Sequence, residues 1–218
     1  MEYNYSNYEV ENAVKDYLWL FKYPSINNKR LLLTCYEVEK ELKEKFPPIG
    51  DNKYGCFSSY YHTEYNLFSF PCQQLQKLYT ILSFSINKII DPEEQYYVRC
   101  WVNLFAQEKN IGWHSHWESE FKTYHGFYCV HTEGKHVDPT IPLNGAQSPN
   151  SPIFIRITSK DGLCVFGKSD GDKHRSSPWL NENHRVTIAF DIIPVGVLRR
   201  YHEFTHKFLH NYIPLYKT

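Results

Sequence analysis

Several features that would assign a function at once are missing from this sequence of 218 residues. Lysine and arginine (24) balance aspartate and glutamate (24), so no global field attracts a polyanion and we do not expect nucleic acid as a partner. The glycines form neither GxGxxG nor GxxxxGK[ST], which excludes the usual phosphate-cradling loops. No apolar run approaches a membrane span, and the polar, acidic start lacks the pattern of a secretory signal. We therefore expect a soluble, cytoplasmic protein without a membrane partner.

The cysteines do not have the spacing of a metal-binding or redox motif. All six lie far apart and form no CxxC pair (Cys35, Cys56, Cys72, Cys100, Cys129 and Cys164). This spacing excludes a zinc ribbon and a CxxC redox motif. Isolated cysteines of intracellular proteins are usually reduced and buried. We therefore expect thiols rather than a disulfide framework.

Aromatic residues are abundant, and the first 91 residues have a helical pattern. Tyr (18), Phe (14) and Trp (5) suit half-buried sheets and the walls of pockets. Apolar side chains recur every three or four residues in three segments: EVENAVKDYLWLFKY (9–23), YEVEKELKEKF (36–46) and CQQLQKLYTILSFSINKII (72–90). This period predicts three helices.

After residue 91 the pattern changes to short aromatic and β-branched runs separated by turn residues. They are QYYVRCWVNLF, HGFYCVHT, SPIFIRIT, GLCVFG and HRVTIAFDIIP, and they predict an antiparallel jelly roll or barrel. The segment EGKHVDPTIPLNGAQSPNSP (133–152) is turn-rich and is expected to be a long loop. We expect one α+β domain (1–218): mainly helical over 1–91, a β core over 92–194, and a C-terminal helix over 195–218. The helices should pack on one sheet face.

The stretch NIGWHSHWESEF carries the candidate metal ligands. His114, His116 and Glu118 are spaced by two, so in an extended segment their side chains share one face. A His-x-Glu pair followed by a later histidine has the order of a 2-His-1-carboxylate site, which leaves positions open on Fe(II). The later histidine is His174, after the run GLCVFG, and Arg185 begins the next run.

Residues 101–193 resemble the double-stranded β-helix core of the 2-oxoglutarate- and Fe(II)-dependent oxygenases. The resemblance is to the small phage and bacterial hydroxylases of that superfamily, which have a prolyl-hydroxylase-like core. The matching motifs are WVN, HSH, GFYC, GLCVF, HRSSP and RVT. The stretch between HSH and GFYC is longer than in these relatives, and FGKSDGDKH replaces a shorter approach to the later histidine.

The resemblance implies a role for each candidate residue. His116, Glu118 and His174 would bind Fe(II), with His114 as the alternative ligand. Arg185 would hold the distal carboxylate of 2-oxoglutarate through its planar fork, and Thr187 would add a hydroxyl. Tyr128 and Asn103 are further candidates for contacts with 2-oxoglutarate. We count His116, Glu118, His174 and Arg185 as the catalytic set.

The expected activity is a dioxygenase reaction that consumes O2 and 2-oxoglutarate and releases succinate and CO2. The hydroxylated substrate would be a protein or peptide side chain or a small molecule, because the fold does not choose between them. Two alternatives stay open. One is a cupin-like zinc or other metal enzyme with an all-histidine site at His114, His116 and His174, and the other is a metal-free β-sandwich binding module.

Overall fold

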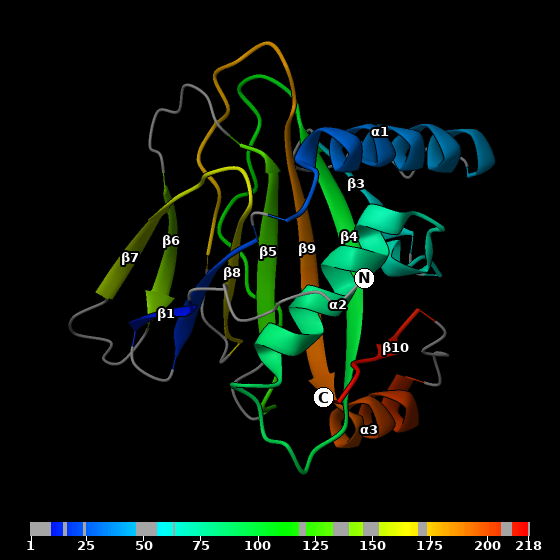
Figure 1. The fold of residues 1–218 in the computed structure, drawn as a ribbon, viewed down its shortest axis with the longest axis vertical. Helices are drawn as coiled ribbons and strands as arrows, with labels where there is room; N and C mark the ends of the chain where they lie inside the picture. Colours follow the sequence, from blue (N-terminus) through cyan, green and yellow to red (C-terminus); the bar gives the residue numbers. More distant parts are fainter. Residues whose placement is uncertain are drawn as a thin grey trace.

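The computed structural model describes residues 10–14, 17–23, 25–46, 56–62, 64–117, 121–132, 140–145, 153–169, 174–205 and 211–217. Its centre is an antiparallel sheet with strand order β1-β2-β8-β5-β9-β4-β10, in which β3 also pairs with β4 (Figure 1). The strands are β1 (Val10–Val14), β2 (Leu18–Lys22), β3 (Cys56–Ser58), β4 (Tyr96–Phe105), β5 (Tyr124–His131), β8 (Leu163–Lys168), β9 (Arg185–Pro194) and β10 (Ile213–Pro214). Five runs predicted as strands after residue 91 are confirmed: four lie in β4, β5, β8 and β9, and the fifth forms β7 (Ile153–Thr158).

Two helices, α1 (Asn28–Lys45) and α2 (Gln73–Ile86), cover one face of this sheet. Leu31, Cys35, Val38 and Leu42 of α1 are all at most 2% exposed and face the main hydrophobic core. The α1 helix begins eight residues before the predicted segment, because the Asn27 side chain accepts a hydrogen bond from the backbone N–H of residue 30. The predicted α+β class, with helices on one sheet face, is therefore confirmed.

The helix predicted for residues 9–23 is wrong. Within this segment Val10–Val14 form β1 and Leu18–Lys22 form β2, and β2 pairs with β8 from Leu18↔Gly167 to Lys22↔Leu163. Leu18, Trp19 and Phe21 are all buried, so neighbouring side chains on opposite sheet faces are covered. A short apolar run fits both the helical and the strand period, and pairing with a distant strand decides between them.

The C-terminal helix is shorter than predicted. Helix α3 covers Val195–Thr205, and the chain has left the helix by residue 211. Ile213 and Pro214 pair with β4, and Leu215 is buried. Proline lacks the N–H that a helix interior requires, whereas an edge strand accepts it.

A second layer lies over the sheet face that the helices leave uncovered. Strands β6 (Thr140–Gly145) and β7 form an antiparallel hairpin, shown at the left of Figure 1. The strand β6 lies inside the segment predicted as a long loop, so that prediction is wrong for residues 140–145. Ile157 of β7 packs with Trp101, Phe127 and Ala189 of the main sheet. The hairpin therefore packs, through Ile157, against the sheet face that the helices leave uncovered.

The structure can be compared with two further expectations from the sequence, on the cysteines and on membrane-spanning segments. The six cysteines form no disulfide, and five of them are buried, which confirms the thiol prediction. Across the described residues, every helix is too short or too polar to cross a membrane.

Candidate active site

A cavity of about 640 Å³ opens on the face of the sheet opposite the helices. Strands alternate their side chains between faces, so every second residue of β4, β5 and β9 reaches this cavity. On β9 these residues include Arg185, Thr187 and Asp191. The register places Asn103 of β4 beside Thr187, and His125 of β5 beside Asp191. Polar side chains from three strands therefore meet in one place.

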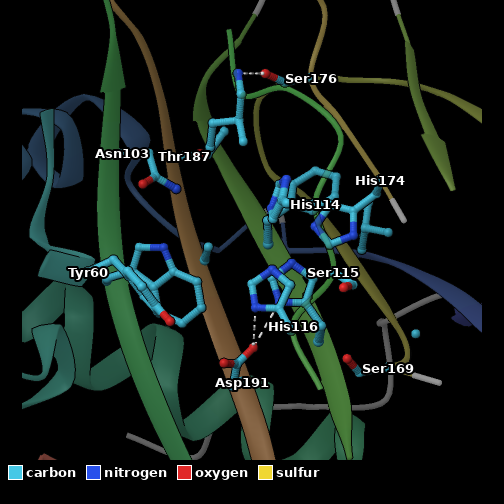
Figure 2. Close-up of a pocket in the computed structure, with 18 of the residues that line it drawn as sticks. Tyr60, Asn103, His114, Ser115, His116, Ser169, His174, Ser176, Thr187 and Asp191 are labelled. Carbon is cyan, nitrogen blue, oxygen red and sulfur yellow. Dashed lines mark hydrogen bonds and ion pairs between the residues drawn. The ribbon is translucent and has the colours of Figure 1, made fainter. Parts of the chain in front are cut away.

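Two loop segments close the cavity and bring the histidines together (Figure 2). The backbone N–H of His114 donates to the carbonyl of His174 at 3.0 Å, and the reverse bond measures 2.8 Å. Further along, the backbone N–H of Ile111 donates to Oγ of Ser176 at 2.8 Å. These bonds form an isolated antiparallel bridge between segments that the sequence separates.

Three histidines form a candidate metal site. Ligand nitrogens of His114, His116 and His174 all lie within 4.8 Å of one another. The ring centroids of His114 and His174 are 4.2 Å apart, and those of His116 and His174 are 5.0 Å apart. This is the alternative set from the sequence, in which His114 joins the other two histidines.

A buried carboxylate lies against this cluster. Oδ1 of Asp191 accepts hydrogen bonds from Nδ1 of His116 and Nδ1 of His125, each at 3.0 Å, and Trp117 Nε1 donates to Oδ2 at 3.4 Å. Burial would raise the pKa of the Asp191 carboxyl, but attraction to His116 and the hydrogen bonds from both histidines outweigh it, so the pKa lies well below its ordinary value. Asp191 is therefore an anion with its hydrogen bonds satisfied.

The opposite nitrogen of His116 has no such partner. Its Nε2 atom is buried, and no hydrogen bond reaches it within the described part of the chain. A buried polar atom without a partner is costly, unless a ligand or metal satisfies it. His116, His125 and Asp191 also place their ligand atoms within 4.8 Å of one another. In that set, however, the carboxylate and both Nδ1 atoms already satisfy each other.

Two histidines of the site, His114 and His125, have lowered pKa values, which favour the neutral form that metal binding requires. Burial lowers the pKa of His125 to about 4, and repulsion from His116 adds to this effect. Burial also lowers the pKa of His114.

Arg185 presents a guanidinium at the other end of the cavity. The side chain is 5% exposed and lies 4.3 Å above the ring of Phe105. Nη1 donates to the carbonyl of Ser177 at 2.9 Å, but Nε and Nη2 are buried with no hydrogen-bond partner among the described residues. Burial lowers the pKa of Arg185 to about 10, so the group stays charged at neutral pH. A buried fork with two unused donors suits a carboxylate.

Thr187 and Asn103 are register partners and lie next to each other in the cavity (Figure 2). Along β9, Thr187 lies between Arg185 and Asp191. Asn103 is 4% exposed, and its Oδ1 accepts a hydrogen bond from Oγ of Ser58 at 2.6 Å. Both side chains line the cavity.

Tyr128 does not belong to this site. It pairs with Ile188 of β9, so its side chain projects from the helix-covered face of the sheet. Its hydroxyl donates to Oδ1 of Asn28 in α1 at 2.6 Å. Side chains of a strand alternate between its two faces. The side chains of the odd-numbered residues of β5 face the cavity, so that of Tyr128 faces away from it. Glu118, the predicted carboxylate ligand, lies outside the described residues.

Sequence reasoning missed Asp191 and His125. Asp191 comes four residues after Thr187, and so on the same strand face as Arg185 and Thr187, in the otherwise apolar run AFDII. An acidic residue inside a fully buried strand was the available signal. His125 begins the GFYC strand, and nothing in its neighbourhood distinguishes it.

No protein-family model matches the sequence, and no curated protein matches it significantly by sequence. Solved structures do match. A prolyl hydroxylase from Trichoplax adhaerens, in complex with a hypoxia-inducible-factor peptide fragment, has a TM-score of 0.63 at 10% identity, covering 88% of this chain and 89% of that one. A prolyl-4-hydroxylase from Pseudomonas putida has a TM-score of 0.60 at 10% identity, covering 84% and 95%.

A third neighbour is the non-heme, α-ketoglutarate-dependent carbocyclase SnoK of nogalamycin biosynthesis, with a TM-score of 0.54 at 8% identity, covering 81% and 79%. These neighbours share one architecture and differ in the reactions that their descriptions give. The structural comparisons therefore confirm the resemblance seen in the sequence: this chain has the double-stranded β-helix fold of the 2-oxoglutarate- and Fe(II)-dependent oxygenases.

Proposed function

We propose that the protein is an Fe(II)- and 2-oxoglutarate-dependent dioxygenase that hydroxylates a small molecule or a peptide side chain and releases succinate and CO2. One observation carries the proposal. A single cavity holds both a cluster of three histidines and the buried fork of Arg185, whose Nε and Nη2 have no partner among the described residues. 2-Oxoglutarate has a keto acid that chelates a metal and a distal carboxylate that needs a cation.

His114, His116 and His174 fit a metal ion on the chemistry of their donors. The buried Nε2 of His116 lacks a partner, while Asp191 holds the opposite nitrogen of the same ring. A carboxylate bound to the far nitrogen of a ligand histidine fixes its tautomer and raises its basicity. We therefore propose these three histidines as the ligands, with Glu118 as the competing candidate from the sequence. The bound iron would supply the activation of O2.

Arg185, Thr187 and Asn103 would hold the co-substrate. The guanidinium would pair with the distal carboxylate, and the Thr187 hydroxyl and the Asn103 amide line the space towards the histidines. The protein's part is then to orient the keto acid and to exclude water, which buried donors do without reorganising during the reaction.

A second candidate function has specific support. The described cluster is all-histidine, which also suits zinc or a cupin-like metal enzyme that uses no 2-oxoglutarate. In that case the unused donors of Arg185 would need another anion.

For the substrate of the proposed dioxygenase, the peptide bound by the Trichoplax neighbour supports a peptide, and the carbocyclase neighbour supports a small molecule.

The test is a titration of 2-oxoglutarate into the anaerobic, Fe(II)-loaded protein. Chelation of the keto acid should produce a visible metal-to-ligand charge-transfer band, and aerobic turnover should release succinate. Iron bound without the band, or zinc retained in preference to iron, would favour the second candidate. Failure to bind any metal would favour the binding module.

Alanine variants of the four candidate ligands decide the metal set. We expect iron to be lost in the variants of His114, His116 and His174 and to be kept in Glu118→Ala. Loss of iron in Glu118→Ala together with its retention in His114→Ala would show that the 2-His-1-carboxylate set is correct instead.

A further inference from the structure

The cavity is much more cationic than the protein as a whole. The full chain has equal numbers of basic and acidic residues. Among the described residues that line the cavity, however, four carry a positive charge (Arg99, Lys168, Arg175 and Arg185) and only Asp191 carries a negative one. The proposed co-substrate would account for Arg185. The remaining charge therefore favours a second anion in the same cavity.

Arg99 is the buried member of the remaining cations. It is 8% exposed, whereas Arg175 is exposed and lies over the Trp113 ring. Nη2 of Arg99 donates to the carbonyl of Tyr60 at 2.6 Å, but its Nε is buried without a hydrogen-bond partner. Along the described ranges no carboxylate forms an ion pair with it. A buried cation without a counter-ion is expensive, which suggests that a ligand supplies the anion.

The neighbouring carboxylate does not fill this role. Asp191 is the direct register partner of Arg99 across β4 and β9. Its Oδ1 instead accepts from both His116 and His125, and no ion pair joins it to Arg99.

Aromatic rings shape the space around Arg99. Its guanidinium lies 4.4 Å above the ring of Tyr60 and 6.0 Å from that of Trp101. The two rings meet edge to face at 5.1 Å. The rings lie against the guanidinium, while its buried Nε has no hydrogen-bond partner among the described residues and can donate to a planar anion.

Arg99 and Arg185 occupy opposite ends of the cavity. Arg185 pairs with residue 105 of β4, so the two arginines are separated by 105 − 99 = 6 strand positions. At about 3.3 Å per residue this is roughly 20 Å of strand. One carboxylate on Arg185 therefore leaves Arg99 available to another molecule. The histidine cluster lies at the Arg99 end, because His116 and His125 contact Asp191, the register partner of Arg99.

We propose that Arg99, flanked by Tyr60 and Trp101, binds the carboxylate of the substrate to be hydroxylated, and that this substrate is a small carboxylic acid. This inference rests on the proposed function. The substrate would exchange one C–H hydrogen for a hydroxyl group, while 2-oxoglutarate is oxidised to succinate and CO2. O2 gives one oxygen atom to the hydroxyl and one to succinate, so the reaction balances without a further reductant.

The experiment compares matched acids and amides on the iron-loaded, full-length protein. A panel of free amino acids and short organic acids is tested for stimulated succinate release, beside the primary amide of each compound and an acidic-peptide library. Calorimetry with Mn(II) and a 2-oxoglutarate analogue that cannot decarboxylate measures binding without turnover. We expect one or more acids to bind and to stimulate release, and their amides to do neither.

Variants of Arg99 assign the effect to this residue. Arg99→Gln should raise the KM for the active acid by about 30-fold or more, the scale of a lost buried charge pair, with a smaller change in kcat. Arg99→Lys should recover part of the loss. Arg30→Gln, at an exposed position of α1, is the matched control and should behave as wild type. The 2-oxoglutarate band should be unchanged in all three.

Three results would overturn the inference while leaving the proposed function intact. They are equal activity of acid and amide, activity with peptides alone, and unchanged KM in Arg99→Gln. Loss of the 2-oxoglutarate band in Arg99→Gln but not in Arg185→Leu would also overturn it, because Arg99 would then anchor the co-substrate. A wild-type protein without the band would instead overturn the proposed function. The acid–amide comparison on wild type stays decisive if Arg99→Gln does not fold.

Discussion

Nδ1 of His116 lies 3.0 Å from Oδ1 of Asp191, and this contact determines which nitrogen of the imidazole is left for a ligand. An ionised carboxylate only accepts hydrogen bonds, so Nδ1 carries a proton and Nε2 is the nitrogen that a ligand can reach. Nε2 is buried and has no hydrogen-bond partner in the described structure. The chain thus prepares one nitrogen of His116 for a metal.

Asp191→Asn tests this relationship. The amide keeps the shape of the side chain but cannot hold the His116 tautomer as an anion does. We expect Fe(II) affinity to fall by about 10- to 100-fold, the usual effect of losing such a partner, in an anaerobic metal titration. Asp161→Asn, at the separate pair with His131, is the control and should bind iron as wild type does. Loss as complete as in His116→Ala would identify Asp191 as a direct ligand.

Variants of Arg185 test how the protein binds 2-oxoglutarate. Arg185→Leu removes a buried, bidentate partner of the distal carboxylate, so a loss of roughly 2 to 5 kcal/mol is expected. This corresponds to about 30- to several-thousand-fold weaker 2-oxoglutarate binding, measured by the charge-transfer titration. Arg185→Lys should recover only part of it, since an ammonium lacks the planar fork. Iron binding should survive both changes, and an unaltered titration curve would contradict this role.

Gly126 offers a test of packing through the stability of the fold. A Cβ at this position of β5 would lie 2.4 Å from the Phe190 ring and 2.4 Å from the carbonyl oxygen of Val165. The backbone oxygen cannot move aside cheaply, so Gly126→Ala should lower the free energy of unfolding by about 3 kcal/mol or more in a urea titration. Gly196→Ala, where a Cβ meets nothing within 4 Å, should be neutral or stabilising by up to about 1 kcal/mol. Equal stability of the two variants would contradict the packing argument.

Thiol reactivity should separate Cys72 from the other cysteines. Burial raises the pKa of Cys56 and Cys129 to about 11 and raises the pKa of Cys35, Cys100 and Cys164 further. Thiol reagents attack the thiolate, which these groups form only above their raised pKa values. Cys72 is only partly buried.

At pH 8 the native protein should therefore show one fast-reacting thiol, and the other five should react only after denaturation. The fast phase should disappear in Cys72→Ser. A second fast thiol that survives in this variant would show that one of the buried sites opens in solution.

The sequence by itself determined the strands that follow residue 91 and several residues of the site. Runs such as HRVTIAFDIIP have strand composition over a length that matches β9, and α2 has an unbroken helical period, so local pattern and tertiary structure agree there. Spacing of two placed Arg185 and Thr187 on one face of a strand, and both line the cavity. The three histidines were also named from the sequence, because their order is unusual.

Only the tertiary structure decided how these parts meet. Leu18–Lys22 form a strand that pairs with β8, and Tyr128 lies outside the site because the strand register directs its side chain towards Asn28. Asp191 joins His116 through a contact between distant segments, which no local pattern encodes. The period of the sequence predicts which side chains share one face of a strand. Which other residues contact that face depends on strand pairing, and the pairing depends on the packing of the whole chain.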